Sequence, residues 1–270
     1  MKKLFKKVLS LFLVFAIVFN TSINVFASNN EESIIIDGYY FKIISKDWKG
    51  VKLSYSDQSG NYIFYLDKKD SNEDAVVEIT KVNAIQTYSE SNNLVSNYQI
   101  KFDKNIEYTE DTNDFSSTML IDQENGREYR LDPKSRIAFV IPVGIPLVAA
   151  AIEALLAVGG VILIAGVAYT LAEEVVEALK KQNKYKYYAA VLRKNAVYVG
   201  GGLTTSQAKP LAYSNDSKGT IFATSFSYAR GLAGNSYRGP ENHGSTEGYW
   251  PHIHARSYTF DYEAHIWYAP

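Results

Sequence analysis

The sequence predicts a multidomain protein with an N-terminal β-rich domain, a central hydrophobic, transmembrane-like α-helical segment and a small C-terminal α+β domain. Three observations lead to this fold class. Short runs of alternating apolar and polar residues fill the first half, a 35-residue apolar block follows, and all four histidines fall in the last 28 residues. The expected boundaries are 28–136, 137–183 and 184–270, after a signal peptide at 1–27.

The first 27 residues have the pattern of a secretory signal peptide. Four lysines between Lys2 and Lys7 precede an apolar run at 8–19, and Val25 and Ala27 suit the −3 and −1 positions of a cleavage site. The apolar run is shorter than the roughly 20 residues of a membrane span, which favours cleavage over a retained anchor. We therefore expect a secreted or membrane-associated protein. The absence of cysteine excludes disulfide bonds, thiolate metal sites and a lipid-modified cysteine.

Charge is distributed unevenly along the chain. Residues 28–136 carry 13 Lys and Arg against 20 Asp and Glu, a net charge of −7, whereas 184–270 carry 9 against 5, a net charge of +4. Such asymmetry indicates separate domains with separate partners. A basic segment with 11 tyrosines is compatible with nucleic-acid binding, because cations contact phosphates and aromatic rings stack on bases. An ordinary β-rich surface is the equally weighted alternative.

The acidic segment 28–136 is expected to form one small antiparallel β domain. Apolar and polar residues alternate at 39–44, 62–66 and 76–79, and turn-forming residues separate these runs. The segment has no histidine or cysteine, and its acids are scattered among lysines. We therefore interpret it as a carrier or recognition module.

The apolar block at 137–171 is interrupted by one acid, Glu153. Since a helical crossing takes about 20 residues, the block exceeds one straight span. A single helix over 148–171 and a helical hairpin turning at Gly159-Gly160 are both open. Small residues suit helix packing in a bilayer, so membrane contact is favoured over a buried core helix. Glu153 would be costly at the bilayer centre. An amphipathic helix is expected to follow at 172–181.

The C-terminal segment reads as a compact α+β unit. The triple glycine at 200–202 resembles a turn, and the P-loop lysine that would make it a nucleotide site is missing. The region 234–248, which carries His243, has the composition of a polar loop. Strands are expected at 185–192, 197–199, 221–224, 249–256 and 264–268, and helices at 204–213 and 226–233.

The last two expected strands form a hairpin that carries three histidines. Because alternate side chains of a strand share a face, His252, His254 and Arg256 lie together, with Trp250 beside them. On the last strand, His265 and Trp267 share a face and Tyr268 takes the other. Whether His265 faces His254 depends on a register that the sequence leaves open.

Three roles are open for these histidines. In the favoured one, His252 or His254 works with His265 as a general acid/base pair, and Arg256 or Arg238 neutralises a phosphate. That arrangement would cleave RNA through its own 2′-hydroxyl without a cofactor. In the second, His252, His254 and His265 bind zinc or another divalent transition metal, completed by an acid such as Glu241, Glu247 or Asp261. In the third, the histidines are exposed strand residues without chemistry.

The layout of export signal, acidic β-rich carrier, apolar block and short C-terminal unit resembles secreted toxins of Gram-positive bacteria. The last 30 or so residues carry the motif. An aromatic-rich His-x-His at His252 and His254 is followed by His265-Ile266-Trp267-Tyr268, which is similar to the terminal signature of polymorphic-toxin C-terminal domains. Such endings often continue to a glycine, whereas this one closes on Ala269-Pro270. The resemblance implies that His243 and the other three histidines are the functional positions.

We therefore expect an exported antibacterial toxin whose C-terminal domain acts on nucleic acid, with RNA favoured as the substrate. A membrane-permeabilising bacteriocin-like protein and a non-toxic membrane-anchored envelope protein are the alternatives. The expected partners are target-cell nucleic acid, a membrane through 137–171 and a neutralising immunity protein. The candidate catalytic residues are His252, His254, His265, His243 and Arg256, and the candidate substrate-binding residues are Arg238, Trp250, Trp267 and Tyr268.

Overall fold

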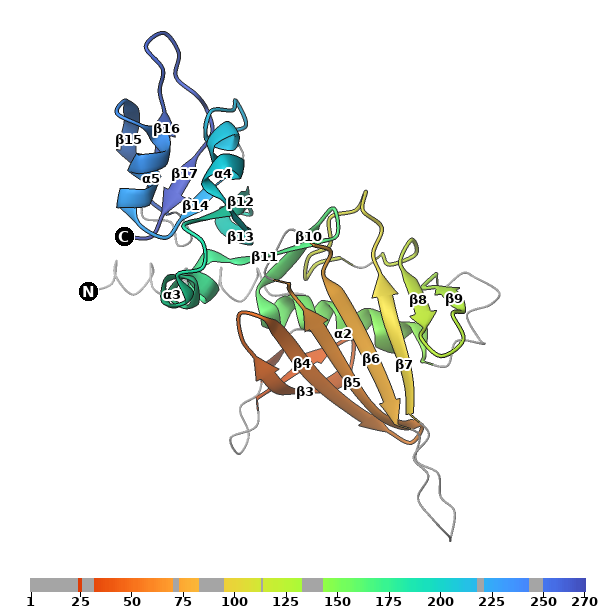
Figure 1. Ribbon diagram of the computed structural model, residues 1–270. Helices are drawn as coiled ribbons and strands as arrows, with labels where there is room; N and C mark the ends of the chain where they lie inside the picture. Colours follow the sequence, from red (N-terminus) through yellow and green to blue (C-terminus); the bar gives the residue numbers. More distant parts are fainter. Residues whose placement is uncertain are drawn as a thin grey trace, which may run out of the picture.

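The protein consists of two lobes, each built on one β-sheet (Figure 1). The orange and yellow strands of the first lobe enclose a green helix, and the blue second lobe carries the C-terminus. The predicted signal peptide falls on residues that the structure leaves undescribed, except for Asn24–Val25. This computed structural model describes residues 24–25, 32–69, 73–82, 95–112, 114–132, 143–217, 221–242 and 250–270.

The first sheet has nine strands that follow one another in chain order. Every neighbouring pair is antiparallel. The strands are β1 (Asn24–Val25), β2 (Ser33–Ile36), β3 (Tyr39–Lys46), β4 (Gly50–Asp57), β5 (Gly60–Asp67), β6 (Val76–Val82), β7 (Val95–Lys101), β8 (Met119–Asp122) and β9 (Glu128–Arg130).

The period-two pattern of the sequence accounts for this sheet. Along β5, Tyr62, Phe64 and Leu66 are buried, and the residues between them are at least partly exposed. One face of the sheet is therefore apolar, as alternation predicts for a half-buried strand. The strands expected at 39–44, 62–66 and 76–79 are confirmed by β3, β5 and β6.

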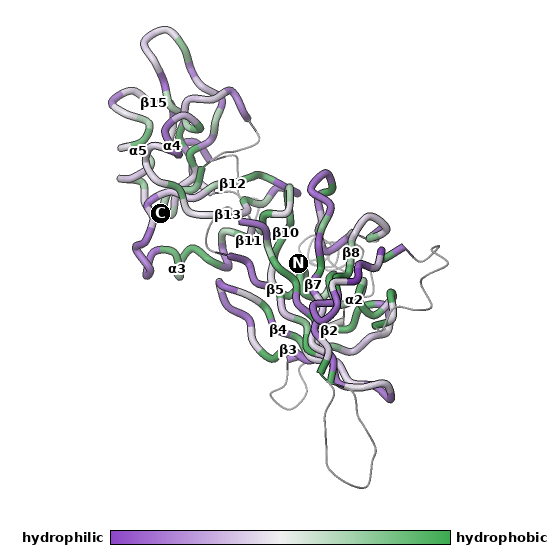
Figure 2. The backbone as a smooth tube through the Cα atoms, turned by 45° about the vertical axis from the view of Figure 1, so that its right-hand side comes forward, coloured by the Kyte–Doolittle hydropathy of each residue, from purple (hydrophilic) through white to green (hydrophobic). Residues whose placement is uncertain are grey.

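The transmembrane-like segment is the incorrect part of the predicted fold class. Within 137–171, residues 145–159 form helix α2 (Ile145–Gly159), which packs on the apolar face of the first sheet. Figure 2 shows this hydrophobic helix lying along the sheet. Val148, Ala154 and Leu155 are completely buried there, within the same core cluster as the strands. Within the described parts of the chain, no helix is long and apolar enough to cross a bilayer.

The second half of the apolar block forms strands instead of a helix. Helix α2 stops at Gly160, which adopts a left-handed conformation with φ 56°. A hairpin follows, made of β10 (Val161–Ile164) and β11 (Val167–Leu171), and its two turn residues both have positive φ. Branched side chains in β10 suit a pleated strand better than a helix. The expected helical turn at Gly159-Gly160 is therefore a helix-to-strand junction.

Glu153 gives a pH dependence that reports on α2. Burial, with smaller contributions from Asp37 and Asp111, raises the pKa of Glu153 from 4.5 to about 7. The folded state therefore holds this proton more tightly than the unfolded state, and stability falls as pH rises from 4.5 to 7. We expect Glu153→Gln to be more stable than the natural chain at pH 8, by about 1 kcal/mol for a half-buried group. The two should converge at pH 4. Urea unfolding at both pH values measures the difference, and an equal gap at both would contradict this assignment.

The second sheet has eight strands in the order β10-β11-β13-β12-β14-β17-β16-β15. Among its described strands, only β14 and β17 pair in parallel. The helices on this sheet are α3 (Ala172–Gln182), α4 (Thr205–Ala212) and α5 (Phe226–Ala233). The remaining strands are β12 (Tyr187–Arg193), β13 (Ala196–Leu203), β14 (Ile221–Ala223), β15 (Tyr237–Glu241), β16 (His252–Ala255) and β17 (Ile266–Tyr268).

Helices cover both faces of the second sheet. On one face, α3 buries Val175 and Val176 in a cluster that also contains Trp267. On the other face, α4 and α5 pack against Ile253 and Ile266. The amphipathic helix expected at 172–181 is thus part of the lobe that holds the histidines. The β10–β11 hairpin connects the two lobes, because β11 pairs with β13, whereas Val161, Leu163 and Ala168 belong to the core of the first lobe.

The triple glycine lies inside β13 and does not form the expected turn. A Cβ atom on Gly200 would lie 2.7 Å from the ring of Tyr169, and one on Gly202 would overlap the ring of Tyr185. Two tyrosine rings therefore pack directly on the strand backbone. Glycine is required at both positions for this close approach.

The opposite charges of the two lobes meet at the junction between them. Arg193 Nε lies 3.0 Å from Glu107 Oε1, and Lys194 Nζ lies 3.0 Å from Glu110 Oε1. The charge asymmetry of the sequence thus partly reflects pairing within the chain. Each such exposed pair contributes only about 0–1 kcal/mol to stability.

Candidate functional site

The two C-terminal strands bring three histidines onto one face of the second sheet. Strands β16 and β17 are antiparallel, with His252 opposite Trp267 and Ile253 opposite Ile266. Continuing this register by one residue puts His254 opposite His265. Directly opposed residues share a face, so both β16 histidines lie on the same side as His265 and Trp267. The predicted hairpin is confirmed.

The three imidazole rings are in mutual contact. Ring centroids are 5.1 Å apart for His252 and His254, 4.6 Å for His252 and His265, and 4.7 Å for His254 and His265. One ring nitrogen from each histidine can be chosen so that all three lie within 4.8 Å of one another. The indole of Trp267 stacks on His265 at 5.0 Å with an interplanar angle of 9°. We call His252, His254 and His265 the histidine cluster.

The cluster is largely enclosed. His252 is 1% exposed and His254 is 2% exposed, whereas His265 is half-buried. The interpretation of the histidines as exposed strand residues is therefore wrong for the two on β16. Polar groups are costly to bury without a compensating interaction, so three adjacent imidazoles form an expensive arrangement for a purely structural core.

A third strand adds two charged residues to the same face. The sequence predicts a loop at 234–248, but its first part forms strand β15, in which Arg238 pairs with His254 and Glu241 pairs with His252. The ladder is irregular between Arg238 and Glu241, at Gly239-Pro240. Because glycine and proline are typical of turns, the sequence pattern predicted a loop here and not an edge strand.

Glu241 links the cluster to Arg238. Its Oε2 atom lies 3.9 Å from His252 Nε2 and 3.7 Å from His254 Nε2, and its Oε1 atom accepts a 2.9 Å hydrogen bond from Arg238 Nε. Burial acts to raise the pKa of Glu241, but Arg238, His254 and His252 outweigh it and lower the pKa below its usual value. Glu241 is therefore ionised at neutral pH.

The electrostatics of His254 favour its uncharged form. Burial and the nearby Arg238 lower the pKa of His254 below 6.5, despite the opposing effect of Glu241. A neutral imidazole has one nitrogen lone pair that can accept a proton or bind a metal ion. Neither ring nitrogen of His254 has a hydrogen-bond partner of normal length among the described residues.

Three of the predicted site residues lie apart from the cluster. Tyr268 points to the opposite face of the sheet and packs on Phe226, with ring centroids 5.0 Å apart. The guanidinium of Arg256 is bound to Asp261 at 2.7 Å beyond the end of β16. Trp250 packs edge-on against Phe222 at 5.2 Å, although its carbonyl oxygen is 3.5 Å from His252 Nδ1. His243 and Glu247 lie outside the described residues.

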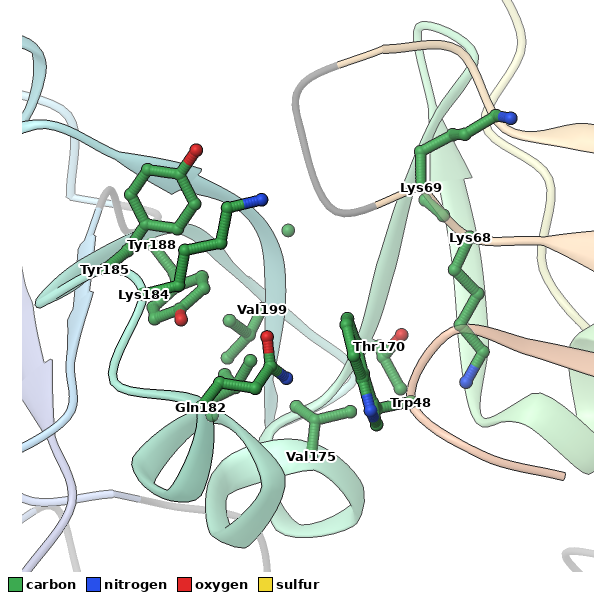
Figure 3. Close-up of a pocket in the computed structure, with 13 residues that line it drawn as sticks. Trp48, Lys68, Lys69, Thr170, Val175, Gln182, Lys184, Tyr185, Tyr188 and Val199 are labelled. Atoms are coloured by element: carbon green, nitrogen blue, oxygen red, sulfur yellow. The ribbon is translucent and has the colours of Figure 1, made fainter.

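A second candidate site is a cavity at the junction of the lobes, shown in Figure 3. Trp48 and Lys68 line it from the first lobe, and Val175 and Tyr185 line it from the second. The ammonium of Lys68 donates hydrogen bonds to backbone carbonyls at Asp47 and Gly159, at 3.1 Å and 3.4 Å. Burial lowers the pKa of Lys68 to about 8. Its cation is therefore already used to hold backbone segments together.

Comparison of the chain with family models, with curated protein sequences and with solved structures finds no match. The candidate function therefore depends on the side chains of the histidine cluster and their surroundings.

Proposed function

We propose that this protein is an exported antibacterial toxin whose C-terminal lobe is a histidine-dependent nuclease, with RNA as the favoured substrate. The observation that carries the proposal is the convergence of His252, His254 and His265 with Arg238 and Glu241 on one face of the second sheet. All five come from three adjacent strands at one edge of the sheet, which is a rigid support for a reactive site.

The arrangement has the two components that phosphodiester cleavage requires. Arg238 is a fixed cation at the partly exposed border of the cluster, suited to neutralise charge that develops on a phosphate. The histidines and Glu241 provide groups that can activate an attacking oxygen. RNA is favoured because its 2′-hydroxyl is an attacking oxygen within the substrate itself.

The first lobe has a different role in this proposal. It contains no histidine, its core is apolar, and its acidic surface pairs with basic residues of the second lobe. We assign it to carriage or recognition of a target cell. A nuclease made by a cell threatens that cell, so the proposal includes a neutralising partner in the producer.

The two arginines named from the sequence should differ in importance. We expect Arg238→Ala to lower the rate of RNA cleavage at least about 10-fold, because it removes a cation next to the cluster. Arg256→Ala should change the rate less than about 2-fold, since exposed ion pairs such as that with Asp261 contribute little. Initial rates on a labelled RNA measure both. An equal loss of cleavage rate in the two variants would mean that Arg238 is not the cation that neutralises the phosphate.

A direct test uses the purified full chain incubated with RNA and with DNA in buffer that contains zinc and magnesium. A variant with His252, His254 and His265 all changed to glutamine is assayed in parallel. The proposal predicts RNA fragments from the natural chain and none from the variant. Intact RNA with both proteins, in an assay where the natural chain is folded, would contradict the proposal.

A further inference from the structure

Three histidines on the second sheet can each offer a ring nitrogen within 4.8 Å of the other two, and Glu241 Oε2 lies 3.7 Å and 3.9 Å from the Nε2 atoms of His254 and His252. We propose that His252, His254 and His265 bind one divalent transition-metal ion of the zinc type, and that Glu241 supplies the fourth donor. Zinc binds imidazole nitrogen and carboxylate oxygen in a four-coordinate tetrahedral arrangement, and magnesium and calcium prefer oxygen ligands. The donor set therefore selects a zinc-like ion.

The candidate donor atoms lie farther apart than the donors of a formed tetrahedral site. With metal–ligand bonds of about 2.0–2.1 Å, two donors of a tetrahedron lie about 3.3–3.4 Å apart. Glu241 Oε2 is already 3.7 Å from His254 Nε2 and 3.9 Å from His252 Nε2. The chosen nitrogens of the three histidines lie within 4.8 Å of one another. Small side-chain rotations around an ion would close the remaining gaps.

Burial and hydrogen bonding fit this role. His254 is 2% exposed, and neither of its ring nitrogens has a hydrogen-bond partner of normal length among the described residues. A buried polar atom without a partner costs about 1–3 kcal/mol. A bound ion would provide that partner. It would also reconcile three adjacent imidazoles with an enclosed position on the sheet.

The groups around the four donors already orient them. Arg238 holds one oxygen of Glu241, so the other oxygen is directed to the histidines. The parallel indole of Trp267 fixes the plane of the His265 ring. Such outer contacts are typical of metal sites, where they orient the ligands.

The inference deepens the proposed function and depends on it only for its catalytic consequence. The histidines would act as ligands instead of proton carriers. Because the protein would supply all four donors, the ion would act as a Lewis acid beside Arg238 only when Glu241 leaves its position or the coordination expands to five. Metal binding itself can be measured without any assay of RNA cleavage.

The test is a zinc titration of the purified full chain after removal of metal with a chelator, in competition with a chromophoric zinc indicator. We expect one zinc ion per chain. His265→Gln and Glu241→Gln should each weaken binding at least about 10-fold, because loss of even an outer contact of a metal ligand costs about 10- to 100-fold. Tyr268→Phe, on the opposite face, should bind as the natural chain does. With cobalt in place of zinc, the natural chain should show the intense visible absorption of a four-coordinate site.

His265 is the preferred position for substitution because it is only half-buried, and thermal unfolding of the metal-free proteins checks that the variant is folded. No saturable zinc binding, or equal affinity in the natural chain and both ligand variants, would overturn the metal site. RNA cleavage that persists in chelator would overturn the catalytic role of the ion and leave the nuclease. One bound zinc without RNA cleavage would support the metal site and contradict the nuclease.

Discussion

Replacing His254 with glutamine should lower the rate of RNA cleavage by the full chain at least about 100-fold, the range expected when a general acid or base is lost. Loss of His254 as a metal ligand would change the rate in the same direction. His254 is central to the cluster, since its ring contacts both other imidazoles and its Nε2 atom is 3.7 Å from Glu241. Glutamine keeps a polar side chain of similar length but cannot act as an imidazole. Initial rates on labelled RNA at constant metal concentration give the comparison.

Two controls make this result specific. Tyr268→Phe alters the same hairpin on its opposite face and should cleave RNA at the natural rate. His265→Gln affects a half-buried member of the cluster and should reproduce the loss with less risk to folding. If the His254 variant keeps the circular dichroism spectrum of the natural chain and cleaves RNA equally fast, the cluster is not the active site.

Shortening Leu155 to alanine should lower the free energy of unfolding of the first lobe by about 2–5 kcal/mol. Leu155 lies on α2, is completely buried and belongs to the core that joins the helix to the first sheet. The loss combines the missing apolar contacts with the cavity that remains. The shift in urea midpoint, followed by circular dichroism, measures it.

Val158→Ala is the matched control for Leu155→Ala. Val158 lies on the same helix but is only partly buried, so its shortening should cost roughly 1 kcal/mol or less. A core helix requires the two variants to differ in this order. Unchanged stability in both would mean that α2 does not form the core of this lobe.

The first sheet could be anticipated because its signal is local. In a strand such as β5, the alternation of Tyr62, Phe64 and Leu66 with more polar residues is visible within eight positions. The hairpin of β16 and β17 was predictable for the same reason. The pairing of His254 with His265 was not, because it is set by the parallel contact of β17 with β14, a strand about 45 residues earlier.

The apolar block was misinterpreted because hydropathy alone does not identify the surroundings of a segment. A continuous apolar run suits a bilayer, a helix enclosed by a sheet and a buried strand equally well. Most of the surface that buries α2 belongs to β2, β3, β4 and β5, all far earlier in the chain, and β10 adds to it. Glu153 was the local indication of a half-buried helix next to solvent.

The sequence predicted the charged residues of the site but not the strand that carries them. Arg238 and Glu241 were both named as candidates, but their strand was taken for a loop because Gly239-Pro240 interrupts it. Arg193 and Lys194, which contributed to the basic charge of the C-terminal segment, pair with acids of the first lobe. Their role depends on the packing of the two lobes.

The most direct test of the central claim is induction of a version that begins at residue 28, so that the chain stays in the cytoplasm of the host cell. Growth, RNA integrity and membrane potential are followed together, with the triple glutamine variant of the histidine cluster as control. We predict growth arrest with RNA fragmentation before any loss of membrane potential, and normal growth of the variant. Arrest of both, with intact RNA and early depolarisation, would contradict a histidine-dependent nuclease.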